Sequence, residues 1–257
     1  MTTGIQGKVA LITGGASGIG KATALALAHE GAKLVIVTAH SVAAAEETVV
    51  QLRDLGAEAM FVRCDVSDES QVEAMVAEAV AGFGRIDLAF NNAGVGPDGV
   101  TIPLAPLTDV AEADWDQVVD TNLKGVFLCL KHELRQMRAQ GSGVIVNTSS
   151  TAGMRVVPAM GAYGPSKAGI ISLTKLAAEE NKSAGIRVNA VCPGPTRHTG
   201  MHDRMMSCIE AGGVPGGAPP IMGVPDDVAR VVVWLCSNEA SHVNGNVISV
   251  DGGLDIV

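Results

Sequence analysis

The segment "KVALITGGASGIGKATALALAHEGAKLVIVT" (residues 8–38) contains the pattern that decides the fold. An apolar run at 8–13 leads into a glycine-rich turn, an Ala- and Leu-rich stretch follows at 18–30, and a second apolar run occupies 33–38. Apolar runs without alternation are typical of parallel strands covered on both faces. The segment therefore predicts a strand, a helix and a second strand parallel to the first.

The same alternation continues along the rest of the chain. Further strand-like runs lie at 59–64, 86–92, 143–150, 186–192 and 246–252, with helix-like stretches such as 68–82 and 226–238 between them. About seven strands separated by helices predict an α/β fold, a doubly wound parallel sheet with helices on both faces. Because no linker or internal repeat divides the chain, residues 1–257 are expected to form a single domain.

Composition and charge argue against several classes of protein. The formal net charge is −9 and no run of Lys or Arg would neutralise phosphates, so nucleic-acid binding is not expected. No stretch approaches the roughly 18 apolar residues of a membrane span, and the start of the chain does not resemble a signal peptide. Five widely spaced cysteines fit no disulfide or zinc framework, and six scattered histidines suggest no catalytic metal. These features predict a cytoplasmic protein without a membrane partner.

The turn after the first predicted strand has the chemistry of a phosphate site. Gly14, Gly18 and Gly20 follow a G-x-x-x-G-x-G spacing directly before a predicted helix. Glycine lets the backbone turn sharply and approach a pyrophosphate, and the free N–H groups of the helix N-terminus can hold it. A tight strand–helix turn without a ligand is the alternative reading of the glycines alone.

Several motifs recur in an order that identifies a family. They are "TGGASGIG" (13–20), "DV" (65–66), "NNAG" (91–94), "TNLKG" with Asn122, "NTSS" ending in Ser150, "YGPSK" (163–167), "CPGP" (192–195) and "VDGG" (250–253). Together they resemble the soluble, about 250-residue branch of the short-chain dehydrogenase/reductases, which have a Rossmann-like fold. The resemblance covers essentially the whole chain.

Tyr163 is the only tyrosine, and Lys167 follows it by four residues. Residues four apart share one face of a helix, so the ammonium can lie near the phenol oxygen. A free tyrosine has a pKa near 10, and a nearby cation in a partly dry cleft favours the phenolate. The spacing therefore allows Lys167 to lower the pKa of Tyr163. Surface packing of the pair is the alternative.

The resemblance implies a role for each of four residues. Tyr163 would be the general acid/base, and Lys167 would lower its pKa and bind the nicotinamide ribose. Ser150, which precedes the tyrosine by the interval usual in the family, would steady the substrate oxygen. Asn122 would anchor a water that relays protons to Lys167. Ser149 and Thr151 are rival hydroxyls, which would point to the opposite face if the strand extends that far, and hydroxyls at a strand end can also simply cap a turn.

The end of the second predicted strand bears on the choice of cofactor. An acidic residue there binds the adenosine ribose of NAD, whereas basic residues meet the 2′-phosphate of NADP. Thr38 occupies the acidic position in this chain, followed by His40 and Ser41. Because no carboxylate would repel a phosphate and these side chains can donate to one, the segment favours NADP(H), with NAD(H) as the alternative.

The resemblance also implies a set of contacts to NAD(P)(H). A one-residue insertion in "CPGPTRHTG" would place Thr199, in place of His198, at the position that holds the nicotinamide carboxamide. The implied contacts are Gly14, Ser17, Gly18, Ile19, Gly20, Thr38, His40, Asp65, Val66, Asn92, Ala93, Gly94, Tyr163, Lys167, Pro193, Gly194, Thr196 and Thr199.

Three variable segments are expected to surround the substrate, at 95–104, 152–160 and 199–222. The last belongs to a Gly-, Pro- and Met-rich stretch at 193–225, which predicts an irregular, mobile lid. Methionines in these segments suit an adaptable apolar pocket, although methionine also fills ordinary cores. Arg155, Arg197 and Arg204 could meet an anionic group. The pattern predicts a small to medium, mainly apolar ketone or secondary alcohol.

The resemblance implies an NAD(P)-dependent oxidoreductase, a carbonyl reductase or alcohol dehydrogenase, with 3-oxoacyl-carrier reduction as a narrower reading. A non-catalytic nucleotide-binding regulator is the first alternative, and the set of Asn122, Ser150, Tyr163 and Lys167 argues against it. A nucleotide-sugar epimerase or dehydratase is the second, and such relatives usually carry a longer C-terminal substrate domain. The resemblance also implies a homotetramer, with "VISVDGGLDIV" (247–257) and the 112–138 region as plausible interfaces.

Overall fold

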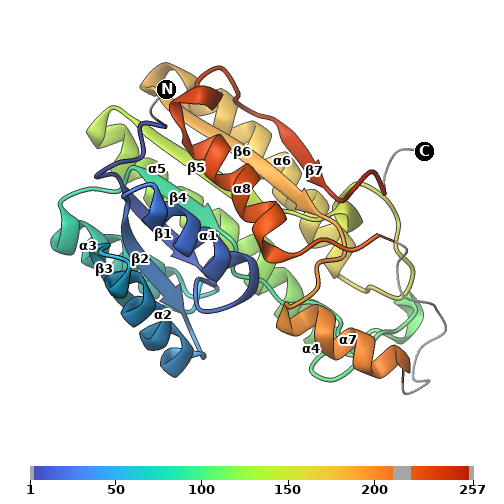
Figure 1. Ribbon diagram of the computed structural model, residues 1–257. Coiled ribbons are helices and arrows are strands. Elements are labelled where there is room, and N and C mark those ends of the chain that lie inside the picture. Colours follow the sequence, from blue (N-terminus) through green and yellow to red (C-terminus); the bar gives the residue numbers. More distant parts are fainter. Residues whose placement is uncertain (1–2, 211–220, 255–257) are drawn as a thin grey trace.

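The computed structural model describes residues 3–210 and 221–254, and it contains one seven-stranded parallel sheet (Figure 1). The strand order is β3-β2-β1-β4-β5-β6-β7, and every neighbouring pair is parallel. The strands are β1 (Val9–Thr13), β2 (Lys33–Thr38), β3 (Ala59–Arg63), β4 (Leu88–Asn91), β5 (Gly143–Thr148), β6 (Ile186–Pro193) and β7 (Val247–Val250). The order changes direction beside β1, which creates the crevice where ligands bind in doubly wound sheets.

Helices cover both faces of the sheet, as predicted (Figure 1). In Figure 1, α1 and α8 cross in front of the sheet, and α5 and α6 lie behind it. The helices are α1 (Gly18–His29), α2 (Val42–Asp54), α3 (Glu69–Phe83), α4 (Glu112–Val119), α5 (Gly125–Gln140), α6 (Tyr163–Asn181), α7 (Gly200–Glu210) and α8 (Pro225–Cys236). Short 3-10 turns lie at Leu107–Asp109, Thr151–Gly153, Lys182–Ala184 and Asn238–Ala240, and a π-helical turn at Asp120–Lys124 joins α4 to α5.

Alternation along each strand divides the core into two layers. Successive side chains of a strand point to opposite faces, so Val9 and Leu11 of β1 pack with α3, α5 and α6, whereas Ala10 and Ile12 pack with α1, α2 and α8. All four side chains are almost fully buried. Both faces need apolar residues, and this explains why the strand runs do not alternate with polar ones.

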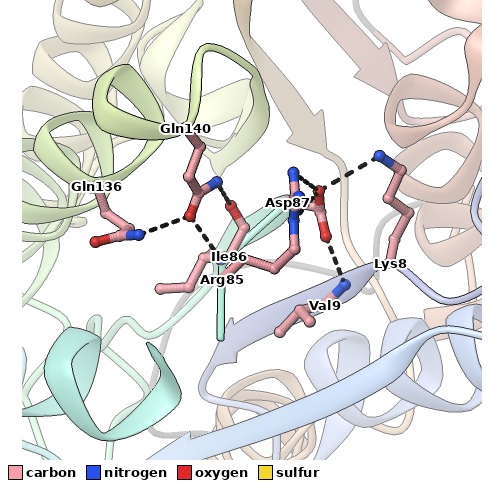
Figure 2. Close-up of polar contacts among 7 residues, drawn as sticks. All are labelled: Lys8, Val9, Arg85, Ile86, Asp87, Gln136 and Gln140. Carbon is pink, nitrogen blue, oxygen red and sulfur yellow. Dashed lines mark hydrogen bonds and ion pairs between the residues drawn. The ribbon is translucent and has the colours of Figure 1, made fainter. Parts of the chain in front are cut away.

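The amino-terminal edge of the sheet is held by a polar cluster around Asp87 (Figure 2). The buried carboxylate accepts from the backbone N–H of Val9 at 3.0 Å and from Nε of Arg85 at 2.9 Å, and Lys8 lies 3.4 Å away. Beside it, Gln140 accepts from the N–H of Ile86 and donates to its carbonyl (Figure 2). Together these contacts set where β1 and β4 begin relative to each other.

The predicted irregular lid at 193–225 is wrong in part, because residues 200–210 form α7. The helix lies beyond the sheet, on the side to which β6 and β7 point (Figure 1). It is preceded by turns around His198, whose φ of 60° is left-handed. Thr196 and Gly223 form a bridge that brings the two ends of the segment together. Residues 211–220 of the predicted lid lie outside the described part of the chain.

Other boundaries also differ from the prediction by about two residues. The strand expected at 143–150 ends at Thr148, because Ser150 turns the chain and accepts from the N–H of Ala152 at 3.1 Å. The strand expected at 246–252 ends at Val250. Among the helices that the structure describes, none is long and apolar enough to span a bilayer.

Candidate active site

A cavity of about 460 Å³ opens at the carboxyl ends of the strands, and it brings most of the predicted site residues together. Those in its lining are Gly14, Ser17, Gly18, Ile19, Asn92, Ala93, Gly94, Ser150, Tyr163, Lys167, Pro193, Gly194, Thr196 and Thr199. The lining does not include the predicted residues Gly20, Thr38, His40, Asp65, Val66 and Asn122. The position of the cavity follows from the parallel sheet, whose strands all end at this edge.

The glycine turn forms a tight cradle at one side of the cavity. Gly14 and Gly18 have left-handed φ angles of 64° and 51°, which other residues rarely adopt. A Cβ atom placed on Gly20 would lie 2.2 Å from the carbonyl oxygen of Gly14, so only glycine fits there. The turn ends at the N-terminus of α1, which suits the diphosphate of a dinucleotide. Gly20 does not line the cavity, but its lack of a side chain allows the turn to adopt this shape.

Polar contacts fix the end of β4 against this turn. The Oγ1 of Thr13 accepts from the N–H groups of Asn92 and Ala93 at 2.9 and 3.1 Å. The side-chain amide of Asn92 donates in turn to the carbonyls of Thr13 and Gly14 at 3.3 and 3.4 Å. Asn92 therefore lines the cavity and also hydrogen-bonds to the glycine turn.

Ser150, Tyr163 and Lys167 meet at the other side of the cavity. Tyr163 is partly buried at the start of α6, and Lys167 is almost fully buried one turn later. The Nζ of Lys167 donates to the carbonyl of Thr148 at 2.9 Å and lies 5.6 Å from the centre of the Tyr163 ring. The rival hydroxyl of Ser149 donates to the carbonyl of Lys167 at 2.8 Å, so it serves to join β5 to α6. This geometry favours Ser150 as the hydroxyl beside Tyr163.

The predicted lowering of the tyrosine pKa is wrong for the protein alone. Burial raises the pKa of Tyr163 above its ordinary value, and a hydrogen bond with the Ser150 side chain offsets only part of the rise. Burial also lowers the pKa of Lys167 to about 8, because its ammonium loses hydration. Desolvation therefore outweighs the expected effect of the cation, and at neutral pH Tyr163 is a phenol that can donate a proton.

Asn122 lies in the π-helical turn between α4 and α5, where it is fully buried. Its Oδ1 accepts from the N–H of Val95 and its Nδ2 donates to the carbonyl of Val95, both at 2.8 Å, and Nδ2 also donates to Ser166 at 3.1 Å. A Cβ atom on Gly94 would lie 3.1 Å from Asn122 Oδ1 and 3.4 Å from Lys167 Nζ. Asn122 thus lies close behind the cavity, and π-helical turns often occur at functional sites.

The residues predicted for the adenosine end lie away from the described lining. Asp65 accepts from the N–H and the hydroxyl of Ser67, an arrangement that forms a turn after β3. Thr38 is half-buried at the end of β2, and His40 is exposed. The sequence analysis did not identify Arg63. In the register of β2 and β3, Arg63 lies opposite Thr38, and its side chain donates to the carbonyl of Ala39 at 3.1 Å. A permanent cation therefore does lie beside this segment.

Asp98 and Arg204 connect α7 to the loop that follows β4. The buried carboxylate of Asp98 accepts from the backbone N–H groups of residues 100–102 and from Nε of Arg204 at 2.6 Å. These bonds hold the pKa of Asp98 at about 2, against the opposing effect of burial. Arg204 thus forms an ion pair with Asp98, whereas the sequence suggested that it could bind an anionic substrate. The two residues are 106 positions apart, so no local pattern relates them.

A buried polar layer lies beneath the cavity, at the ends of β4 and β5. Asn91 donates to Glu133 at 2.9 Å and to Asn147 at 3.0 Å, and Asn147 donates to Thr174 at 3.0 Å. One carboxylate oxygen of Glu133 has no hydrogen-bond partner. Burial raises the pKa of Glu133 to about 7, although the Asn91 amide partly opposes the rise.

This raised pKa predicts that the protein loses stability as pH rises from about 4.5 to about 7. Between pH 4.5 and about 7 the folded state retains a proton on Glu133 that the unfolded state releases. The stabilisation is therefore complete below this window and is lost above it, an effect of about 3 kcal/mol. Glu133→Gln, which keeps the shape of the protonated acid, should remove this loss, so its advantage over wild type in the free energy of unfolding grows from about pH 4.5 to about 7 and is constant above that. Urea titrations at several pH values measure this, and parallel pH profiles for the two proteins would contradict it.

Within the described residues, no group of three or more His, Cys, Asp or Glu side chains could hold a metal ion. The glycine cradle and the helix N-terminus that border the cavity fit a dinucleotide.

Comparisons with known proteins agree with this geometry. A family model described as "Enoyl-(Acyl carrier protein) reductase" matches residues 14–255. A short-chain dehydrogenase/reductase of Aspergillus oryzae is 38% identical, over 98% of this chain and 97% of its own length. The chain belongs to the short-chain dehydrogenase/reductase family.

Other relatives of this short-chain dehydrogenase/reductase are named as oxidoreductases. Levodione reductase of Leifsonia aquatica is 40% identical, over 98% of this chain and 96% of the relative. Cis-4-hydroxycyclohexanecarboxylate dehydrogenase of Sinomonas cyclohexanicum is also 40% identical, over 97% of both chains. The solved structure of an NAD⁺-bound xylitol dehydrogenase superposes with a TM-score of 0.90 at 35% identity, over 97% of this chain and all of the other. The protein is an NAD(P)-dependent oxidoreductase that acts on CH–OH and C=O groups.

Proposed function

We propose that this enzyme interconverts a ketone and a secondary alcohol, with Tyr163 as the proton donor or acceptor. The observation that carries the proposal is the meeting of Ser150, Tyr163 and Lys167 in the same cavity as the glycine cradle. When bound there, the nicotinamide cofactor would supply or accept the hydride at the carbonyl carbon. Measuring steady-state turnover of a ketone with a reduced nicotinamide cofactor tests the proposal.

The chain's own residues handle the oxygen of the substrate. The hydroxyls of Ser150 and Tyr163 orient the carbonyl oxygen, and Tyr163 gives it a proton as it becomes an alkoxide. The adjacent Lys167 stabilises the phenolate that remains, because opposite charges attract strongly in a partly dry site. Asn122 holds Val95 and Ser166, so its role is to position α6 and the loop after β4. The raised pKa of Tyr163 supports reduction at neutral pH, since reduction needs the protonated phenol.

The substrate side of the cavity supports a small to medium, mainly apolar compound. Met160, Met201 and Met205 line it together with Val157. Flexible thioethers adapt to different apolar shapes. A 3-oxoacyl-carrier substrate is a narrower candidate, which is supported by a 38% identical 3-oxoacyl-[acyl-carrier-protein] reductase of Staphylococcus aureus that covers 96% of this chain and 98% of the relative. We further propose that α7 acts as the lid over this side.

For the cofactor we propose a preference for NADP(H) over NAD(H). Thr38 and His40 can donate to a 2′-phosphate, and Arg63 adds a cation beside them. No carboxylate occupies the Thr38 position, where one would bind the ribose diol and repel a phosphate.

Thr38→Asp is expected to reverse the preference. A carboxylate at this position repels the 2′-phosphate and accepts from the ribose diol, so the ratio of kcat/KM for NADPH to that for NADH should fall by roughly 10- to 100-fold. Arg63→Gln is the matched variant: it should lower kcat/KM for NADPH and leave the value for NADH unchanged. An unchanged ratio in both variants would mean that the 2′ position of the ribose lies elsewhere.

We also propose a cytoplasmic homotetramer. Phe127 on α5 and Leu176 on α6 are about half exposed on one face of the molecule, and Trp234 on α8 is 39% exposed on the other. A tetramer with dihedral symmetry needs two different self-complementary faces, which these positions supply. The region 112–138 predicted as an interface contains Phe127, whereas residues 255–257 of the predicted C-terminal interface lie outside the described residues. Analytical ultracentrifugation should give a mass four times that of one chain, and a monomer would contradict the assignment.

A further inference from the structure

One side of α7 packs against the loop that follows β4. Nε of Arg204 donates to Oδ2 of Asp98 at 2.6 Å. One helical turn later, Cys208 lies so close to the loop that a Cβ atom built on Gly99 would be 2.5 Å from its Sγ atom. Because residues four apart share one side of a helix, the same side of α7 makes both contacts. An ion pair is therefore part of the interface between this helix and the loop.

The same loop also touches the reacting centre. A Cβ atom built on Gly96 would lie 2.6 Å from the ring of Tyr163 and 3.3 Å from the sulfur of Met201, in the first turn of α7. The buried Asn122 fixes the start of the loop through two hydrogen bonds to the backbone of Val95. The loop therefore connects the position of α7 with the position of the Tyr163 ring.

The two carboxylate oxygens of Asp98 have different partners. Oδ1 accepts from the backbone N–H groups of residues 100–102, which holds the loop in its turn, whereas Oδ2 accepts from Arg204. The side chain of Asp98 is 1% exposed and that of Arg204 is 47% exposed. Removal of the guanidinium would leave a buried carboxylate facing α7, which is costly unless water reaches it. We therefore expect α7 to move away from the loop when the charge of Arg204 is lost.

A shift of α7 would change the substrate side of the cavity. Met201 and Met205 lie on α7, four residues apart, and both belong to the cavity lining. Movement of the helix away from the loop would carry both thioethers with it and widen this side. A small ketone would then lose contacts with the methionines, whereas a bulky ketone would gain room.

We propose that the ion pair between Asp98 and Arg204 positions α7 and thereby sets the size of the ketone that the cavity accepts. The inference rests on the proposed reduction of a ketone. Neither residue belongs to the cavity lining, so both are positioning residues that act through Met201 and Met205.

The first test is the selectivity of Arg204→Met, which keeps much of the side-chain volume and removes the charge. Two ketones of different bulk, cyclohexanone and cyclododecanone, are compared by kcat/KM at saturating NADPH. Because a hydrogen bond between charged groups is lost at a partly exposed position, the ratio of kcat/KM for the small ketone to that for the bulky one should fall by roughly 5- to 50-fold. Arg204→Lys, which keeps the charge, should recover part of the ratio.

The second test uses Cys208 to report the position of α7 without any substrate. Cys208 is partly buried against the loop, and the other four cysteines are buried. Alkylation of Cys208 by iodoacetamide, located by mass spectrometry, should be about fivefold faster or more in Arg204→Met, because a local opening exposes the thiol. The buried cysteines should stay unmodified, which separates movement of α7 from general unfolding. Adding Asp98→Asn to Arg204→Met removes the buried charge and should slow the alkylation again.

Arg230→Met is the matched control. Arg230 forms an ion pair with Asp227, also at 2.6 Å, on α8, which contributes no residue to the described lining. This variant should keep the wild-type alkylation of Cys208 and the wild-type selectivity. Wild-type alkylation in Arg204→Met, or wild-type selectivity in that variant, would overturn the inference. If wild-type enzyme consumed no reduced cofactor with any ketone, the proposed function would fail, and the alkylation rates would still decide whether the ion pair positions α7.

Discussion

Tyr163→Phe is expected to reduce kcat for ketone reduction by about 10²- to 10⁴-fold, the usual contribution of a general acid. The variant removes one oxygen atom and keeps the ring, which packs against Val118 and Ala162. Folding and the Kd for NADPH should therefore stay close to the wild-type values. A large fall in kcat with unchanged cofactor binding is the signature of a group that acts in the chemical step.

The same assay across pH tests the assigned protonation state of Tyr163. Because burial raises the pKa of Tyr163, the proton needed for reduction is present throughout the neutral range. Reduction should therefore vary little between about pH 6 and 8, whereas oxidation of the alcohol should increase with pH, since it needs the phenolate. Near-normal kcat in Tyr163→Phe, or a reduction rate that collapses between pH 6 and 7, would remove Tyr163 from this role.

Gly20→Ala is expected to weaken both folding and cofactor binding. The added methyl group would lie 2.2 Å from the carbonyl oxygen of Gly14 and 2.8 Å from the side-chain nitrogen of Asn92. Backbone cannot move aside as a flexible side chain can, so the glycine turn must change shape. We expect a loss of about 1–3 kcal/mol in the free energy of unfolding, the usual cost of overpacking. We also expect the Kd for NADPH to rise by about tenfold or more, since a loss of 1.4 kcal/mol in binding suffices.

Gly82→Ala provides the matched control for this variant. Gly82 also lies inside a helix, α3, but the nearest atom to its added methyl group would be the sulfur of Met60, at the flexible end of a side chain. Alanine is the better helix former, so stability should match or exceed that of wild type. If Gly20→Ala bound NADPH with wild-type affinity, the glycine turn would not be the diphosphate site.

The architecture could be predicted from the sequence because its signals are local. The apolar run at Val9–Thr13 and the glycine spacing that follows it are each contained within a few residues, and they fix a strand, a turn and a helix. The parallel sheet then places every strand end at one edge. The residues that follow strands, such as Asn92 and Ser150, are therefore brought to one cavity.

Features that depend on contacts across the fold could not be predicted. Arg63 reaches the 38–41 segment only because β3 pairs with β2 in a defined register, and Arg204 finds its partner Asp98 far away in the sequence. The sequence does not reveal the helical character of α7, because a Gly- and Pro-rich stretch follows it directly. The pKa of Tyr163 depends on burial, which a spacing of four residues to Lys167 does not reveal.

We propose that this cavity carries out hydride exchange between a nicotinamide cofactor and a carbonyl carbon. The most direct test is the rate at which wild-type enzyme consumes NADPH or NADH with and without a small panel of apolar ketones. The proposed function predicts ketone-dependent consumption, faster with NADPH, together with formation of the matching secondary alcohol. Tight binding of the cofactor without ketone-dependent consumption would contradict it and would favour a non-catalytic nucleotide-binding protein.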